Sequence, residues 1–499
     1  MKTLATELLE RASSTPDAIA VVDQFGEHAI GTVVSTAQRV ADAIAAHRDE
    51  APTVIVQADN TWLTLACVVA TGLRDGVVAV LSPHATASEF DLAVEDIAPD
   101  VVIATDEVLE HWGATDGRFG HRLLAGDRTV LAADTFGAID RWAGGSAVAM
   151  TSGSTGRPKC VVQSEKAIRY AAQSTIEIVG LRPGEAVGAF VPLSSVAAFC
   201  FGLYLPAYLG GRMVSIERWT PAGALEAMRR HEVAWTMLVP TMALQLSIAD
   251  GADQPLTSLR AMTVGGGPMN VRALREAEET LGTTFLRVFG MSECLGHTSP
   301  LPTDPPELRL GRDGKPFPGT VVRAVDASGA ELPPGQIGDA QVRGPSLFVG
   351  YARGGVPQPP ELTADGFLPT GDLVEVGEDG FIQVMGRQKQ IIIRGGRNID
   401  INEVESAIAG LPGVVQVCVV PVPDDLLGER AAALVVAGDA EITLESITAQ
   451  LDQSGFPKFK WPEYVFSVED LPQNRVGKLS RPDAISLASR LAGRTHENA

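Results

Sequence analysis

The chain has 499 residues, of which 45% are hydrophobic, 20% charged and 5% aromatic, and its formal net charge at pH 7 is −21. This composition is that of a folded globular protein, which excludes a disordered or fibrous chain. The length exceeds the usual range of one domain, so we expect a large domain and at least one smaller unit. The negative charge argues against a protein that binds nucleic-acid phosphates and favours a small-molecule partner.

The N-terminal pattern and the cysteines both predict a cytoplasmic protein. Leu4, Leu8 and Leu9 form one apolar face with Glu7 and Glu10 between them, which is typical of an amphipathic helix rather than a secretory signal. The five cysteines are Cys67, Cys160, Cys200, Cys294 and Cys418. They are widely spaced, without a C-x-x-C pair or a histidine placed to complete a zinc site, so we expect reduced thiols.

Short apolar runs alternate with helical patterns through the first part of the chain. The clearest runs are 53–57, 77–81 and 101–104, and such alternation is typical of parallel strands with crossover helices. A further run, 147–150, leads directly into a polar loop at 151–159. We therefore expect a flexible loop at the end of a buried strand.

The stretch 186–216 is charged only at Arg212 and is long enough to be mistaken for a membrane span. Pro192, Pro206 and the pair Gly210-Gly211 interrupt it. A buried strand, loop and helix therefore explain it better, and we expect no membrane span.

The pattern changes twice in the second half of the chain. After a last βα-like unit at 286–289, Pro/Gly-rich text at 301–334 and short strands such as 321–325 predict a β-rich subdomain. Beyond residue 386, helical faces flank an apolar strand at 414–422, which predicts an α+β unit of about 110 residues. The expected fold class is α/β, with stacked mixed or parallel sheets and helices in residues 1–386 and a small α+β domain in residues 387–499.

The loop at 151–159, with the sequence TSGSTGRPK, is the strongest local signal. Gly153 and Gly156 permit tight turns that direct backbone N–H groups at phosphates, and four hydroxyls add donors. It is not a Walker A loop, because Arg157 and Pro158 separate Gly156 from Lys159. A run of this composition is more often a solvated loop, so its interpretation depends on the motifs that accompany it.

Further motifs follow in order along the chain. They are GGGP at 265–268, FGMSE at 289–293, GFLPTGD at 366–372, Gly386-Arg387, GGRNIDINEVE at 395–405 and LPQNRVGK at 471–478. Each alone is a weak match, but all of them in this order rarely arise by chance. Over about residues 145–485 the chain resembles the ANL superfamily of adenylate-forming enzymes, which includes acyl-CoA and aryl-CoA ligases, nonribosomal peptide adenylation domains and luciferases.

The resemblance implies an ATP- and Mg²⁺-dependent reaction in two steps. A carboxylate attacks the α-phosphorus of ATP and pyrophosphate leaves; the acyl- or aryl-adenylate then passes to the thiol of coenzyme A or of a carrier-protein phosphopantetheine. The resemblance also implies a mobile C-terminal domain that carries the catalytic lysine and rotates between the steps, exchanging Lys478 for the Gly395-Gly396 face. Neutralising charge is the main task in such chemistry.

The resemblance also implies roles for individual residues. Glu293 is the expected Mg²⁺ ligand, with Thr155, because a hard cation that bridges phosphates prefers oxygen ligands. Lys478 is expected to bridge the attacking carboxylate and the α-phosphate. The predicted ATP-binding residues are Thr151, Ser152, Gly153, Ser154, Thr155, Gly156, Lys159, Gly266, Gly267, Pro268, Phe289, Gly290, Met291, Ser292, Asp372 and Arg387.

Two of these residues, Asp372 and Arg387, come late in the chain, and a third predicted residue, Lys389, marks the hinge. Asp372 should accept hydrogen bonds from the ribose hydroxyls, a task suited to a carboxylate. Arg387 should contact the ribose or a phosphate, and Lys389 falls where the family has its interdomain hinge. Without the motifs, each would be read as an ordinary turn or surface residue.

The acid-binding region departs from the family pattern. Cys160 stands where the family has glycine, which we interpret as a packing change, with a reactive thiol as the alternative. Ser195 stands where many acyl-CoA ligases have histidine or an aromatic residue, and 186–216 has no acidic residue to pair with the ammonium of an α-amino acid. The candidate pocket residues, which general core packing would also explain, are Ser195, Phe199, Phe201, Met237, Val239, Gly265 and Met291.

Two other functions remain open at this stage. One is a stand-alone adenylating enzyme that delivers the activated group to an amine or another non-thiol nucleophile. The other is a nucleotide-binding protein without catalysis, against which the retention of Glu293, Asp372, Arg387 and Lys478 argues. The expected partner is a small carboxylic acid, with a carrier protein as one thiol donor and no nucleic acid.

Overall fold

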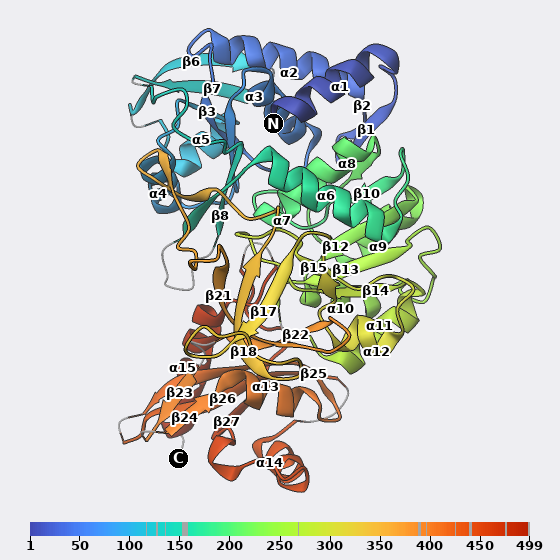
Figure 1. Ribbon diagram of the computed structural model, residues 1–499, viewed down its shortest axis with the longest axis vertical. Coiled ribbons are helices and arrows are strands. Elements are labelled where there is room, and N and C mark those ends of the chain that lie inside the picture. The colour runs from blue at the N-terminus through green and yellow to red at the C-terminus, as the bar shows by residue number, and fades with distance from the viewer. Residues whose placement is uncertain are drawn as a thin grey trace.

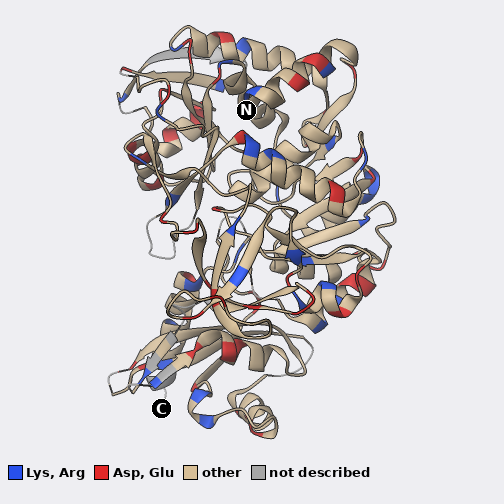
Figure 2. Ribbon diagram, in the orientation of Figure 1, with Lys and Arg blue, Asp and Glu red and all other residues tan. Residues whose placement is uncertain are grey.

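The computed structural model describes residues 1–499 except 116, 126–127, 135, 152–157, 268, 388–390, 396, 425, 439–441, 475–476 and 498–499. It is a mixed α/β molecule with a large N-terminal domain of sheets and helices and a smaller C-terminal domain (Figure 1). Lysine, arginine and acidic side chains are scattered over helices and loops of both parts (Figure 2). Within the described ranges, no helix is both long and apolar enough to cross a membrane.

The first sheet contains the three strands that the apolar runs predicted. In order across the sheet, its strands are β20 (Val356–Gln358), β19 (Gly350–Arg353), β9 (Lys159–Gln163), β8 (Ala147–Thr151), β4 (Val77–Leu81), β3 (Thr53–Gln57), β5 (Val101–Ala104), β7 (Arg128–Ala133) and β6 (Phe119–Ala125). The central strands β3, β4, β5 and β8 are parallel, whereas β9, β7, β6 and β19 pair antiparallel. Side chains of β3 alternate between two buried clusters, with Val54 and Val56 on one face and Ile55 on the other, as a strand covered on both faces requires.

The second sheet runs beside the first and shares its larger core. Its strands, in order, are β14 (Phe285–Val288), β13 (Ala261–Gly265), β12 (Val233–Leu238), β10 (Ala186–Gly188), β11 (Arg212–Val214), β1 (Ile19–Asp23) and β2 (Gly26–Ala29). Neighbouring strands from β14 to β1 are parallel, and one hydrophobic cluster contains both Val56 of the first sheet and Val264 of the second. The two sheets are therefore stacked layers of one domain.

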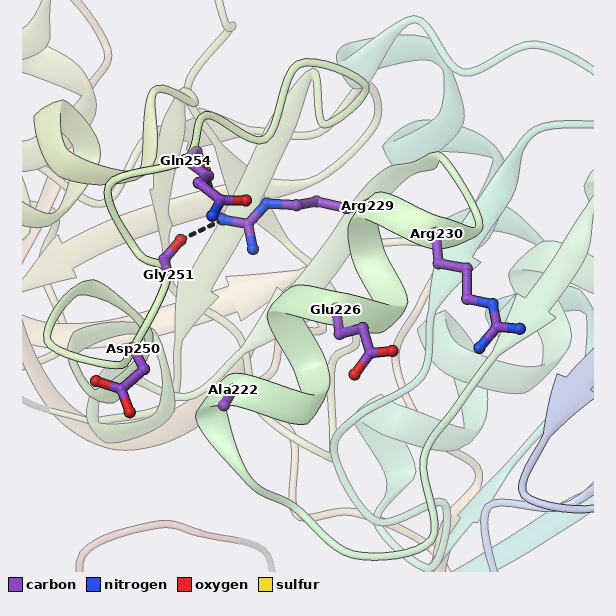
Figure 3. A pocket seen from close by; sticks show the side chains of 7 residues that line it. All are labelled: Ala222, Glu226, Arg229, Arg230, Asp250, Gly251 and Gln254. Atoms are coloured by element: carbon purple, nitrogen blue, oxygen red, sulfur yellow. Dashed lines mark hydrogen bonds between the residues drawn. The ribbon is translucent and has the colours of Figure 1, made fainter.

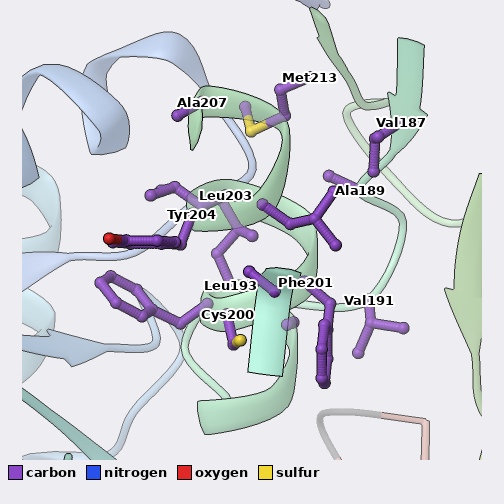
Figure 4. Packing of buried hydrophobic residues seen from close by; sticks show 14 of the residues in the cluster. Val187, Ala189, Val191, Leu193, Cys200, Phe201, Leu203, Tyr204, Ala207 and Met213 are labelled. Atoms are coloured by element: carbon purple, nitrogen blue, oxygen red, sulfur yellow. The ribbon is translucent and has the colours of Figure 1, made fainter. Parts of the chain in front are cut away.

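The stretch 186–216 is buried, as its interruptions predicted. It forms β10, a short helix α7 (Val196–Ala198), a π-helical turn (Phe199–Tyr204), α8 (Leu205–Leu209) and β11. Cys200, Phe201, Leu203 and Tyr204 pack among apolar residues of the neighbouring strands and loops (Figure 4). The π-helical turn was not foreseen, because apolar periodicity does not distinguish it from an α-helix.

Helices cover the sheets and connect their strands. The remaining helices of the large domain are α1 (Lys2–Ser14), α2 (Ile30–Ala45), α3 (Trp62–Leu73), α4 (Ala87–Ile97), α5 (Asp106–Trp112), α6 (Glu165–Val179), α9 (Pro221–Arg230), α10 (Pro240–Ser247), α11 (Val271–Leu281) and α12 (Pro306–Gly311). The N-terminal helix predicted from Leu4 and Leu8 is α1, which buries both residues. It lies against α2 and α3 in the upper part of Figure 1.

A β-rich third layer and a C-terminal unit complete the molecule. The third sheet has the order β17 (Val321–Val325), β18 (Ile337–Arg343), β21 (Leu368–Val376) and β22 (Ile382–Arg387), and all its pairs are antiparallel. A separate antiparallel pair, β15 (Thr298–Ser299) and β16 (Lys315–Pro316), precedes it in the chain. The C-terminal sheet contains β24 (Arg397–Asp400), β23 (Ile391–Arg394), β26 (Gly428–Ala437), β25 (Val414–Asp424) and β27 (Tyr464–Ser467). With α13 (Ile401–Ala409), α14 (Leu444–Gln453) and α15 (Arg481–Glu497) it encloses two hydrophobic clusters of its own.

Candidate active site

Some of the predicted site residues lie at one edge of the second sheet, and others lie on the first and third sheets. The parallel strands β10, β12, β13 and β14 end at the same edge, and the loops that follow them contain Ser195, Val239, Gly265 to Gly267 and Phe289 to Glu293. In open α/β sheets, ligands bind beyond the carboxyl ends of the strands. The sheet topology thus brings together residues from four separate segments.

The C-terminal domain brings Lys478 to this same edge. A Cβ atom built on Gly266 would lie 3.0 Å from both Cε and Nζ of Lys478. The preceding residue, Gly477, contacts the segment that follows β12: a Cβ built on it would lie 3.3 Å from Val239 Cγ2 and from Sδ of Met242, in the first turn of α10. The lysine therefore extends over the end of β13 while its backbone lies against the end of β12.

The loop that carries Lys478 is held in one shape by its own hydrogen bonds. Asn474 Oδ1 accepts from Lys478 N–H at 3.0 Å, and Asn474 N–H donates to Lys478 O at 2.7 Å. Directly after the loop, Arg481 donates two hydrogen bonds to the buried Glu405 carboxylate, at 2.8 and 2.9 Å. The loop is thus anchored to the body of the C-terminal domain.

Two glycines at the end of β13 are required by close approaches. A Cβ on Gly265 would lie 2.7 Å from Val288 Cγ2 and 2.9 Å from Val288 O. Gly266 has a positive φ of 86°, which disfavours other residues, and any side chain there would meet Lys478. The GGGP motif therefore allows the lysine to approach the backbone.

Glu293 connects the second sheet to the first through a tyrosine that the sequence did not indicate. Tyr351, on β19, donates a 2.7 Å hydrogen bond from its hydroxyl to Glu293 Oε1. The ammonium of Lys159, on the adjacent strand β9, lies 4.8 Å from the centre of the Tyr351 ring. Burial and the Glu293 carboxylate raise the pKa of Tyr351, so the hydroxyl keeps its proton and remains a donor. Glu293, Tyr351 and Lys159 form a cluster that links both sheets.

Buried polar side chains hold the backbone of the FGMSE segment by hydrogen bonds. Gln163 on β9 donates to Ser292 O at 2.8 Å, and Phe289 N–H donates to Thr298 Oγ1 at 3.0 Å. The Phe289 ring makes an edge contact with His297, whose pKa burial lowers to about 4. His297 is therefore neutral at pH 7, and its Nδ1 donates to Cys294 O at 2.8 Å. Phe289, Gly290, Met291 and Ser292 themselves are partly exposed at the sheet edge.

Asp372 and Arg387 lie opposite one another on neighbouring strands. They are directly paired in the antiparallel register of β21 and β22. Asp372 is only 4% exposed, and its N–H donates to Thr370 Oγ1 at 3.1 Å. The side chain of Arg387 lies outside the described part of the structure, as do residues 152–157, Pro268 and the hinge candidate Lys389. The predicted phosphate-binding residues Ser152, Gly153, Ser154, Thr155 and Gly156 thus lie outside the described residues, and of the loop only Thr151, Pro158 and Lys159 are described.

The acid-pocket candidates differ in their surroundings. Phe199 is part of the large core, Phe201 packs edge-on against Trp235, and Val239 contacts the Lys478 loop. Met237 and Met291 are partly exposed. Ser195 caps α7, since its Oγ accepts from Ala198 N–H at 3.2 Å. Cys160, on β9, is buried in the smaller hydrophobic cluster of the large domain, which favours its packing role over reactivity.

Two recognised families cover most of the chain. One, described as AMP-binding enzyme, matches residues 8–352, and another, described as AMP-binding enzyme C-terminal domain, matches residues 403–478. The first match alone spans more than half of the chain. The chain belongs to the AMP-binding enzyme family. It is thereby an adenylate-forming enzyme of the ANL superfamily, as its motifs predicted.

The curated relatives of this chain include a pyochelin synthase and a salicylyl-CoA synthase. Pyochelin synthase PchD of Pseudomonas aeruginosa (strain UCBPP-PA14) is 34% identical over 67% of this chain, but the match spans only 61% of that relative. Salicylyl-CoA synthase / salicylate adenylyltransferase of a Streptomyces species is 31% identical over 96% of this chain and 92% of the relative. The chain thus spans less than two thirds of one curated relative and nearly all of the other.

A solved structure superposes on nearly the whole chain. ATP-bound MatB from Rhodopseudomonas palustris is 27% identical and superposes with a TM-score of 0.84, covering 98% of this chain and 99% of MatB. The apo form of the same MatB gives a TM-score of 0.74 at the same identity and coverage. The present structure is therefore more similar to the ATP-bound form than to the apo form.

The residues present fit the Mg²⁺ that AMP-binding enzymes use. Across the described ranges, no group of three or more His, Cys, Asp or Glu is arranged to hold a metal. Mg²⁺ bound with nucleotide phosphates keeps several waters and needs only one or two carboxylates from the protein. Glu293, which Tyr351 orients through one oxygen, can provide such a single carboxylate.

An open depression elsewhere on the large domain has no part in this site. It has a volume of about 650 Å³ and lies between α9 and the segment after α10, lined by Glu226, Arg229 and Asp250 (Figure 3). Arg229 donates to the carbonyls of Gly251 and Gln254. The guanidinium is therefore used to hold the local backbone together.

Proposed function

We propose that this chain is an AMP-forming acid–thiol ligase, which uses ATP and Mg²⁺ to convert a carboxylic acid into an acyl- or aryl-adenylate and then transfers the acyl group to a thiol. The observation that carries this proposal is the approach of Lys478 Cε and Nζ to within 3.0 Å of the Cβ position of Gly266. An ammonium at this edge can stabilise negative charge that develops between the carboxylate and the α-phosphate.

The other residues of the site would each support this chemistry. Glu293 would hold the Mg²⁺, with Thr155 in the phosphate loop, and the bound cation would offset phosphate charge. Asp372 would accept hydrogen bonds from the ribose hydroxyls, and Arg387, which is paired with it in register, would contact the ribose or a phosphate. Lys159 would neutralise charge beside the phosphate loop.

The interdomain arrangement supports an enzyme poised for the first half-reaction. The structure is more similar to MatB with bound ATP than to apo MatB. In the second half-reaction, the C-terminal domain would rotate about a hinge near Lys389, so that the Gly395-Gly396 face replaces Lys478 and a thiol can enter. We place the domain boundary of this motion between residues 386 and 387.

An aryl or other apolar acid is the proposed substrate class, and coenzyme A or a carrier-protein phosphopantetheine the acceptor. Phe201 packs edge-on against the buried Trp235 of β12, Phe289 follows β14 at the sheet edge, and 186–216 contains no acidic side chain that could pair with an amino group. The relative named salicylyl-CoA synthase, which aligns over 96% of this chain, agrees with this choice.

The test is ATP–pyrophosphate exchange with a panel of carboxylic acids, followed by addition of coenzyme A and detection of a thioester. Lys478→Ala should slow exchange by at least about 10²-fold, because a preorganised donor to the transition state is lost. Lys458→Ala, which removes an exposed lysine paired with Asp452 in the same domain, is the matched control and should exchange at the wild-type rate.

The possible outcomes separate the functions. Near-normal exchange by Lys478→Ala would contradict the catalytic assignment. Exchange without a thioester would favour an amine or another non-thiol acceptor. No exchange with any acid would favour a nucleotide-binding protein without catalysis.

A further inference from the structure

A threonine outside the family motifs holds the backbone next to Lys478. Thr241 Oγ1, in the large domain, donates a 2.8 Å hydrogen bond to the carbonyl oxygen of Gly477, in the C-terminal domain. Thr241 is 8% exposed and lies in the first turn of α10, directly after the end of β12. This contact therefore joins the two domains at the residue that precedes the lysine.

The peptide unit between Gly477 and Lys478 is fixed at both of its polar ends. Its carbonyl accepts from Thr241, and its N–H donates to Asn474 Oδ1 at 3.0 Å. Because a peptide unit is planar, two hydrogen bonds on opposite sides determine its orientation. The direction in which the Lys478 side chain leaves the backbone is then largely determined.

Apolar contacts with the large domain also fix the position of the Gly477 backbone. Gly477 has a positive φ of 73° and lies against Val239 and Met242, which stand on either side of the Pro240-Thr241 pair in sequence. Beyond this contact, the lysine side chain runs to Gly266 at the end of the adjacent strand β13. The residues that follow β12 and β13 thus contact the Lys478 loop, and Thr241 donates the hydrogen bond that holds the Gly477 carbonyl.

We propose that Thr241 is a positioning residue for adenylation, which acts through Lys478 by fixing the Gly477 carbonyl. The proposal rests on the proposed function, in which Lys478 serves only the first half-reaction. Rotation of the C-terminal domain would break the Thr241–Gly477 hydrogen bond. Thr241 should therefore matter for adenylate formation and not for acyl transfer.

The test compares the two half-reactions in Thr241→Val. Exchange should fall by about tenfold, the loss expected when a buried carbonyl loses its neutral donor. Transfer from a chemically prepared acyl-adenylate to the thiol should stay at the wild-type rate. Thr241→Ser, which keeps the hydroxyl, should restore most of the exchange.

Thr236→Val is the matched control because it removes the same kind of contact within the large domain. Thr236, also near the end of β12, donates from its hydroxyl to Gly188 O at 2.9 Å. Its loss should leave the ratio of the two half-reaction rates unchanged, even if the variant is less stable. Thermal melting of each variant confirms that the comparison uses folded protein.

A double-mutant cycle shows whether Thr241 acts through Lys478. In a Lys478→Ala background, adding Thr241→Val should change the residual exchange by less than about twofold. The effects of two residues that act through the same interaction are not additive, and the lysine side chain that Thr241 positions is already absent. A full tenfold loss in that background, or equal loss in both half-reactions, would overturn the positioning role. Wild-type exchange by Thr241→Val would overturn it as well, whereas failure of the wild-type protein to exchange with any acid would refute the proposed function instead.

Discussion

Tyr351 and Glu293 show how a single contact can prepare a charged residue for its task. A carboxylate on a loop has several accessible rotamers, and holding one of them costs side-chain entropy. The 2.7 Å hydrogen bond from the Tyr351 hydroxyl selects one position, and the tyrosine is itself fixed by its strand and by Phe348. The neighbouring Lys159 ammonium makes a cation–π contact with the same ring, which stabilises its position.

Tyr351→Phe should weaken the contribution of Glu293 without removing its charge. The variant keeps the ring and the cation–π contact but loses the donor, so we expect exchange to slow by about fivefold, from roughly 1 kcal/mol of lost hydrogen bonding. The concentration of Mg²⁺ needed for half-maximal exchange should rise by a similar factor. Titration of Mg²⁺ at saturating ATP measures this, and an unchanged Mg²⁺ requirement would show that Tyr351 has only a structural role.

At the scale of elements, Asn270 connects the start of one helix to the end of another. Its Oδ1 caps α11 by accepting from Arg272 N–H at 2.9 Å and Ala273 N–H at 3.2 Å. Its Nδ2 donates at 2.6 Å to Ala409 O, at the C-terminal end of α13. The same amide therefore stabilises a helix of the large domain and contacts the C-terminal domain.

Two substitutions at Asn270 separate these effects. Asn270→Ala should lower the free energy of unfolding of the large domain by about 1 kcal/mol, because α11 loses its cap. Asn270→Asp keeps a capping oxygen but places an anion near the negative end of α13, so it should retain most of the stability and weaken only the interdomain contact. Urea unfolding gives the first quantity and pyrophosphate exchange the second. Equal destabilisation by both variants would contradict this division.

At the scale of the whole molecule, the proposed function requires the C-terminal domain to occupy two positions in turn. The five cysteines are buried, so cysteines introduced at exposed Glu279 on α11 and Glu445 on α14 can be labelled selectively. With ATP and Mg²⁺, spin-label distances should cluster around the separation in this structure. Addition of a substrate acid and its thiol acceptor should produce a second population as the domain rotates. One unchanged distribution under all conditions would argue against domain rotation.

The sequence by itself determined the fold class, the family and several of the central strands. The runs at 53–57, 77–81, 101–104 and 321–325 coincide with β3, β4, β5 and β17, and the run at 286–289 lies one residue from β14. These features are local, because a buried strand shows its apolar pattern in its own residues. Ordered motifs likewise identify a family without reference to contacts.

Only the tertiary structure decided which side chains meet. Thr241 and Gly477 are 236 residues apart, and Tyr351 reaches Glu293 across 58 residues and two sheets. Neither Thr241 nor Tyr351 carries a charge or belongs to a motif that marks it in the sequence. Their positions follow from strand order and domain placement, which are set by the packing of distant segments, so no local pattern could reveal them. The roles of Lys478, Glu293 and Asp372 stay predictions that the proposed experiments address.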